Sequence, residues 1–207
     1  LILIIGCKVE YNKNDYLIKV LGNLEKIKSA TYFSTATGTP PGDTSTLHTY
    51  YKFKKEFVNP ADTFIGSTFA WFDVNDTSKM YLCYDGNANI NINNDSKTIS
   101  IDSFKTSSLP FRMIGEPFFH KAKSLIKYAL ETHDSITTNL TDVGDSIKFT
   151  LFVPEIINFF GRPHIFDSHY LSKDEKYSKY EMWINKSNDL PYKIRDRKLT
   201  HIAALGL

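Results

Sequence analysis

Asp85, Asn87 and Asn89 stand at alternate positions, as oxygen ligands do at the start of a D-x-N-x-N calcium loop. Such a loop next needs a glycine for its sharp turn, and at its end a glutamate that binds the ion with both oxygens. Ile90 and Ser96 occupy those two positions. We therefore interpret the three residues as the polar face of a hairpin.

Ser124 and Lys127 match the S-x-x-K pattern of serine acyl-enzymes, in which the lysine reaches the nucleophile from one helical turn away. The S-D-N and K-T-G motifs that complete such a site are missing from the sequence. The pattern alone does not predict an acyl-enzyme.

His164, Asp167 and His169 could offer two imidazoles and a carboxylate to a metal ion. Their spacings of three and two fit neither one helical face nor one strand face, so a polar loop is the favoured interpretation. The sequence shows no glycine-rich phosphate loop, G-x-S-x-G motif or evident acid/base pair. We expect no catalytic residue, no metal and no cofactor.

Cys7 ends the apolar run Ile4-Ile5-Gly6-Cys7 and is followed at once by a polar segment rich in asparagine and lysine. An aliphatic residue three before a cysteine and a small residue just before it resemble the lipobox of a bacterial lipoprotein signal. The run is far shorter than the ~20 residues of a membrane-spanning helix. We expect residues 1–7 to be the end of a signal and Cys7 to be lipidated, which anchors the protein at the periplasmic face of a cell-envelope membrane or in the outer membrane. A short buried strand is the alternative.

Cys83 would then be the one free thiol, since the sequence has two cysteines. It alternates with Tyr81 in an apolar run, which favours a small core residue over a nucleophile. Two cysteines cannot form a disulfide framework, and no C-x-x-C motif is present.

Residues 66–102 read as a meander of antiparallel strands, with runs over 69–74, 80–84, 89–93 and 98–101 separated by turn-forming clusters. Ile90 and Ile92 alternate with asparagines, which is typical of a strand with one face in water. The run at 69–74 is apolar on both faces, because Phe69 and Trp71 alternate with Phe72. Something apolar must cover its second face.

Two segments have apolar residues at helical spacing, and we predict helices over 15–29 and 116–132. The second helix is the best candidate for the cover of the sheet. The remaining strands are predicted over 31–37, 47–57, 136–140, 147–153, 156–160, 177–185 and 192–197.

A chain of 207 residues suffices for one domain with a substantial core. Its aromatic content of 14% favours a β-rich fold. The net charge of +2 gives no field that would indicate nucleic acid as a partner. Lys52, Lys54 and Lys55 are interpreted as a solvated strand face rather than a phosphate-binding patch.

The order of a helix, a long meander, a second helix and a closing hairpin is similar to the LolA-like fold, a curved half-barrel with helices on its concave face. Several motifs, taken in order, resemble a module of Bacteroidetes lipoproteins that typically precedes a thioredoxin-like domain of the TlpA type. They are Pro41-Gly42-Asp43-Thr44, Asn59-Pro60 with Asp62-Thr63, Tyr84-Asp85-Gly86, Pro117-Phe118-Phe119, Tyr180-Glu181 with Trp183-Ile184-Asn185, and Asp189-Leu190-Pro191-Tyr192-Lys193.

The resemblance implies an α+β fold of mainly antiparallel strands in a single LolA-like domain over residues 8–207, and the handling of acyl chains or another hydrophobic ligand. Two departures stand out. The redox C-x-x-C of the thioredoxin part is absent, and the chain ends at residues 201–207, soon after a strand, where related proteins continue. A fragment and a shifted reading frame both stay open.

We expect a lipid-anchored protein that binds a hydrophobic or lipidated ligand without catalysis. Its partners are the membrane, through Cys7, and a lipid or acylated ligand, with no nucleic acid. The expected lining of the ligand site, for which plain core packing is the alternative, is Phe69, Trp71, Phe72, Phe118 and Phe119. Two other roles stay open: an accessory module of a thioredoxin-like oxidoreductase, and a structural surface lipoprotein with a filled concavity.

Overall fold

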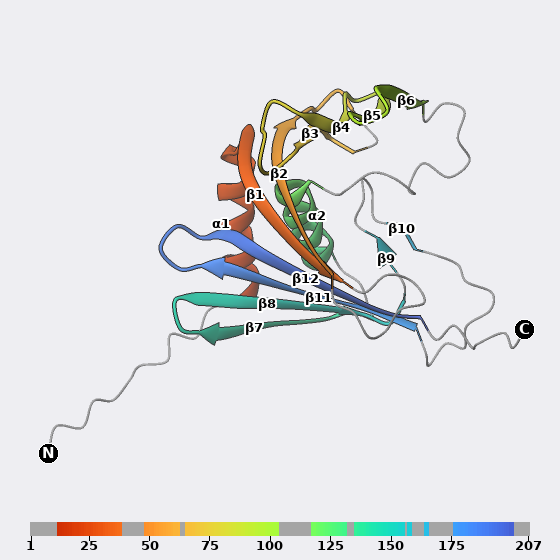
Figure 1. Cartoon of the computed structure of the whole chain (residues 1–207). Coiled ribbons are helices and arrows are strands. Elements are labelled where there is room, and N and C mark those ends of the chain that lie inside the picture. The colour runs from red at the N-terminus through yellow and green to blue at the C-terminus, as the bar shows by residue number, and fades with distance from the viewer. Residues whose placement is uncertain are drawn as a thin grey trace, which may run out of the picture. The chain divides into compact units, whose positions relative to one another are not determined.

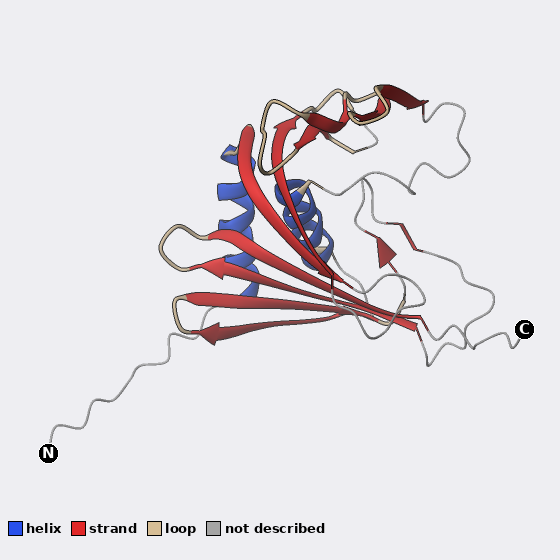
Figure 2. Ribbon diagram, viewed as in Figure 1, coloured by secondary structure: helices blue, strands red, loops and turns tan. Residues whose placement is uncertain are grey.

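The computed structural model describes residues 12–38, 48–62, 65–103, 117–131, 135–155, 157–158, 164–165 and 176–200. Within them the protein is an α+β fold in which the strands of the two larger sheets pair antiparallel and two helices accompany them (Figures 1 and 2). Cys7, Asp167, His169 and the motif at 41–44 lie outside the described residues. The coarse fold class expected from the sequence is confirmed.

The chain divides into two compact units. The first, which we call the six-stranded unit, is built mainly from residues 27–121. The second, the four-stranded unit, uses described residues that precede 27 and follow 121. The single domain over residues 8–207 stays a prediction.

The six-stranded unit is an antiparallel meander in which each strand pairs with the next one along the chain. Asp85 Oδ1 accepts the N–H groups of Asn87 (2.7 Å) and Ala88 (2.8 Å) in the turn after the fourth strand, so the predicted hairpin is confirmed there. The strands are β1 (Ser29–Gly38), β2 (His48–Val58), β3 (Ser67–Phe72), β4 (Met80–Tyr84), β5 (Ala88–Asn93) and β6 (Thr98–Ser103).

The four-stranded unit has the strand order β12-β11-β8-β7, formed by β7 (Thr137–Val143), β8 (Ser146–Val153), β11 (Lys176–Asn185) and β12 (Leu190–Thr200). Helix α1 (Lys13–Lys26) belongs to it, and α2 (Phe118–Leu130) begins in the six-stranded unit and continues here from Ala122. Two short strands, β9 (Ile157–Asn158) and β10 (His164–Ile165), pair with each other. His164, expected in a loop, therefore lies in a strand; a two-residue strand leaves no periodic pattern in the sequence.

The apolar spacing of both helices is reflected in their burial. Leu17, Val20 and Leu24 of α1 are fully buried, as are Leu125 and Ile126 of α2. Helix α1 contacts β12, and Lys19 Nζ lies 2.7 Å from Asp189 Oδ2 in the turn before that strand. The predicted amphipathic helices are confirmed, with ends that differ by a few residues from the expected ones.

The prediction for β5 fails at one position. Asn89, expected to face water, is fully buried, whereas Ile90 and Ile92 are half-buried. The pairing register is the reason, because it places Asn89 beside Tyr84 and on the same face as that buried ring. Alternation in one strand does not reveal which of its faces the rest of the sheet buries.

Tyr180 in β11 supplies a test of the four-stranded core. Its buried hydroxyl donates to the backbone carbonyl of Ile157 at 2.7 Å. Tyr180→Phe removes this buried hydrogen bond, so we expect the free energy of unfolding in urea to fall by about 1–3 kcal/mol. Tyr177→Phe, which removes a hydroxyl with no described partner from the same strand, is the control and should change it by at most about 0.5 kcal/mol. Equal effects of the two changes would contradict the assignment.

Candidate functional site

The register of the six-stranded sheet sorts its side chains onto two faces. One row runs through Glu56, Phe69, Tyr84 and Asn89, and its neighbour runs through Lys54, Trp71, Leu82 and Asn91. We call the side that carries these rows the Glu56 face. The opposite side, the Phe53 face, carries Phe33, Phe53, Phe72, Cys83, Ile90 and Ile101.

The five residues expected to line a ligand site do not share one surface. Phe69 and Trp71 are on the Glu56 face, in a buried cluster with Ile65, Leu82 and Tyr84. The rings of Phe118 and Phe119 contact the ring of Tyr32, with centroids 6.0 and 5.8 Å away. Phe72 lies on the Phe53 face, where its ring centroid is 5.9 Å from that of Phe53.

The cluster around Phe69 is packed like a core. Phe69 and Tyr84 are each 2% exposed, and their ring centroids are 5.6 Å apart. Lys52 Nζ and Lys54 Nζ lie 3.9 and 4.6 Å from the centroid of Trp71, which are cation–π distances. Burial lowers the pKa of Lys52. These lysines are half-buried over an aromatic ring, so the expectation of a solvated strand face is wrong for them.

Other polar groups are also buried on the Glu56 face. Four buried polar atoms make no hydrogen bond within the described part of the chain: Ser67 Oγ, Trp71 Nε1, and Oδ1 and Nδ2 of Asn89. Buried polar groups disfavour contact with a purely apolar ligand, which could satisfy none of them. With the two lysines, they make this face a poor surface for a hydrophobic molecule.

Glu56 has a specific role at the start of α2. Its side chain is 4% exposed. Oε2 accepts the N–H of Phe119 at 3.1 Å, and Oε1 accepts the N–H of His120 at 2.8 Å. The first N–H groups of a helix have no partner within the helix, and the helix dipole favours a negative charge there. A strand residue distant in sequence thus performs the task usually left to a capping residue.

Tyr32 completes this arrangement. Its hydroxyl donates to Glu56 Oε2 at 3.2 Å and accepts the N–H of Phe118 at 3.0 Å. Burial, and secondarily the charge of Glu56, raises the pKa of Tyr32, so the hydroxyl stays a donor throughout the physiological range. The next N–H of the helix, that of Lys121, bonds to the carbonyl of Pro117 at 3.0 Å. Four successive N–H groups at the start of α2 are therefore satisfied.

Three of the motifs that carry the family resemblance meet near this helix start. Tyr84 O–H donates to Asp62 Oδ2 at 2.9 Å. Gly86 has a φ of +101°, which L side chains rarely adopt, and a Cβ atom there would lie 2.8 Å from Asn59 Nδ2, so this turn favours glycine. The motif of Pro117 opens the helix that Glu56 holds. These motifs have structural roles in the six-stranded unit.

The Phe53 face has the opposite character. Phe33 and Ile101 are each 68% exposed, Ile99 is 64% exposed and Phe57 is 48% exposed. Exposed apolar residues are ordinary when scattered, but a contiguous patch usually marks an interaction site. Lys55, on β2, is half-buried on this face, with Nζ 5.1 Å from the centroid of Phe72. This face was not foreseen as a whole, although its residues are the alternate apolar positions of the strands.

Cys83 also lies on the Phe53 face, opposite Ile90. It is half-buried, as expected for a small packing residue. Burial, followed by the charge of Asp85, raises the pKa of its thiol, which disfavours the reactive thiolate. Among the residues that the structure describes, no group of three or more His, Cys, Asp or Glu side chains could hold a metal ion.

Comparison with known proteins gave no match to a family model and none to a curated protein. No helix within the described ranges is long and apolar enough to cross a membrane.

The cap on α2 gives a stability prediction. Glu56→Ala leaves two N–H groups of the helix start unpaired, and we expect the free energy of unfolding to fall by about 2–4 kcal/mol. Chemical denaturation followed by far-UV circular dichroism measures this. Glu25→Ala removes an exposed carboxylate that lies 3.5 Å from Lys127 Nζ, and should cost at most about 0.5 kcal/mol. A Glu56→Ala protein as stable as the wild type would refute the role of the carboxylate.

Proposed function

We propose that this protein is a lipid-anchored protein of the bacterial cell envelope that binds a hydrophobic or acylated ligand without catalysis, on the Phe53 face of its six-stranded sheet. The observation that carries the proposal is the exposure of large apolar side chains on that face, with Phe33 and Ile101 each 68% exposed. Water contact with such a surface is unfavourable by about 25 cal/mol per Å². A ligand that covers it gains that free energy, less the entropic cost of binding.

The proposed ligand has an acyl chain and an anionic group. The chain matches the rings of Phe33, Phe53 and Phe72, which follow one another across β1, β2 and β3. The anionic group matches Lys55, the one lysine or arginine on this face among the described residues of β1 to β6. A fatty acid or an acidic phospholipid has both parts.

We also propose that the chain has the LolA-like fold. The element order and the motifs resemble LolA-like lipoprotein modules, for which a curved half-barrel is expected. Such modules imply handling of acyl chains, which agrees with an apolar sheet face. The site differs from the one expected from the sequence, because the Glu56 face carries Lys52, Lys54 and a buried carboxylate, whereas the Phe53 face is apolar.

Membrane anchoring is tested at Cys7. If Cys7 carries the lipid, Cys7→Ser should move the protein from the membrane fraction to the soluble fraction, because the acyl chains that hold it are lost. Fractionation of cells that express the full-length gene measures this. Cys83→Ser is the matched control and should leave the protein in the membrane fraction. Membrane association that persists in Cys7→Ser would exclude this anchor.

Ligand binding is tested on β6, where adjacent residues face opposite ways. Ile101→Asp places a charge on the Phe53 face and should lower the affinity for a fluorescent fatty acid at least about tenfold, which corresponds to about 1.4 kcal/mol. Ser100→Asp places the same charge on the Glu56 face and should leave that affinity unchanged. A fluorescence titration measures both.

Lys55→Met distinguishes the contribution of the ligand's anionic group to binding from that of its acyl chain. It should weaken binding of the fatty acid but not of its methyl ester, since only the acid carries a negative charge. If neither Ile101→Asp nor Lys55→Met changes the titration, the ligand does not bind to the Phe53 face.

A further inference from the structure

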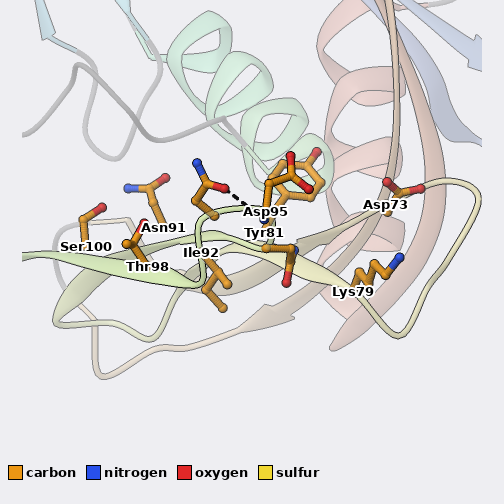
Figure 3. A pocket seen from close by; sticks show the side chains of 10 residues that line it. Asp73, Lys79, Tyr81, Asn91, Ile92, Asp95, Thr98 and Ser100 are labelled. Atoms are coloured by element: carbon orange, nitrogen blue, oxygen red, sulfur yellow. Dashed lines mark hydrogen bonds between the residues drawn. The ribbon is translucent and has the colours of Figure 1, made fainter.

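A polar pocket of about 590 Å³ lies at the β4–β6 end of the six-stranded sheet (Figure 3). Strands β4, β5 and β6, the loop after β3 and the turn between β5 and β6 contribute to it. Its volume falls in the range of about 300–1,000 Å³ that is usual for small-molecule sites. The pocket is separate from the Phe53 face in character, because most of its lining residues are polar.

A β-bulge gives the pocket its aromatic wall. The pairing of β3 with β4 shifts register between Trp71 and Phe72, which leaves Tyr81 as the extra residue on β4. Bulges redirect side chains, often beside functional sites. The Tyr81 ring packs edge-on against Trp71, with centroids 6.1 Å apart, and so lies on the Glu56 face instead of alternating away from it. Figure 3 shows the ring on the same side of the strands as Asn91 and Ser100.

Several polar groups that line this pocket have no protein partner. Within the described residues, the hydroxyl of Tyr81, the amide of Asn91, the carboxylate of Asp95 and the hydroxyl of Ser100 make no hydrogen bond to protein atoms. Asp73 uses Oδ1 to accept the N–H of Asn75 at 2.7 Å, and its second oxygen is uncommitted. Together these groups supply both donors and acceptors.

The charges narrow the class of ligand. Asp73 and Asp95 repel an anion, while Lys79 adds a positive charge that disfavours a divalent cation. Lys79 Nζ is 3.3 Å from Asp76 Oδ2, so it is partly neutralised at the rim. Burial, and secondarily Asp73, raises the pKa of Tyr81 to about 12, so its hydroxyl stays protonated. A neutral ligand that both donates and accepts hydrogen bonds suits the pocket.

We propose that this pocket binds a neutral saccharide. A pyranose ring has an apolar C–H face that can stack on the Tyr81 ring, and adjacent hydroxyls that can bond to amides and carboxylates at once. Asn91 on β5 and Ser100 on β6 are paired in register, so their side chains lie side by side. Asp73 and Asp95 supply further acceptors from the two flanking loops. The site is independent of the proposed acyl-binding face.

The test uses a panel of glucose, galactose, N-acetylglucosamine, maltose, cellobiose and lactose. Saturation-transfer NMR on the wild-type protein should detect at least one of them, with a dissociation constant below about 5 mM by titration, which is roughly 3 kcal/mol of binding free energy. Tyr81→Ala should weaken that binding about tenfold, whereas Tyr81→Phe, which keeps the ring, should stay within about threefold. Tyr51→Ala changes an exposed tyrosine of the same sheet and should have no effect.

Thermal unfolding shows whether each variant is folded. If Tyr81→Ala does not fold, the double variant Asn91→Ala/Ser100→Ala replaces it and should weaken sugar binding by the same factor. The proposal is overturned if no sugar of the panel binds at a concentration ten times the dissociation constant stated above, or if folded Tyr81→Ala binds the sugar like the wild type. It is also overturned if calcium alone shifts the melting temperature of the protein while every sugar leaves that temperature unchanged.

Discussion

The six-stranded unit depends on one buried carboxylate. Glu56 stands near the end of β2, yet its oxygens accept the N–H groups of Phe119 and His120, more than sixty residues later in the chain. A helix start left unpaired in a buried setting would cost several kcal/mol, so the position of the carboxylate fixes where α2 can begin. Tyr32 adds a bond to the carboxylate and one to the helix. The part of the Glu56 face that holds Glu56, Phe69 and Tyr84 is thereby committed to packing and helix capping, while the proposed saccharide pocket lies at the β4–β6 end of that face.

That commitment determines what the other face can do. Successive side chains of a strand point to opposite faces of the sheet. The residues between the polar positions of the Glu56 face therefore point to the Phe53 face. On β2, Lys52, Lys54 and Glu56 alternate with Phe53 and Phe57. The usual arrangement of an antiparallel sheet puts the apolar face inward and the polar face in water. Here Glu56 is 4% exposed and Phe57 is 48% exposed, which is why we place the ligand on the Phe53 face.

The sequence pattern was sufficient to predict the elements but not their partners. Both helices and the strands of the meander were predicted within a few residues, because apolar spacing and turn residues are local signals. Glu56 was missed because, in a run of lysines and aromatic residues, nothing local distinguishes a capping carboxylate from a solvated one. Asn89 was expected to face water and is buried, and Phe72 was expected to line the same site as Phe69 and lies on the opposite face. Both differences arise because the pairing register decides which face each side chain occupies. The position of the Tyr81 side chain on the Glu56 face depends on a β-bulge, which shifts the alternation of side chains by one residue. Such a bulge cannot be recognised from the amino-acid composition.

The proposed acyl ligand contacts the Phe53 face and not the Glu56 face. Paramagnetic broadening of methyl NMR signals by a doxyl-labelled stearate tests it most directly, because the effect falls off steeply with distance. We expect strong broadening of Ile99 and Ile101 and little change at Leu82, whose side chain is buried on the Glu56 face. Broadening of Leu82 with unaffected Ile99 and Ile101 would contradict it.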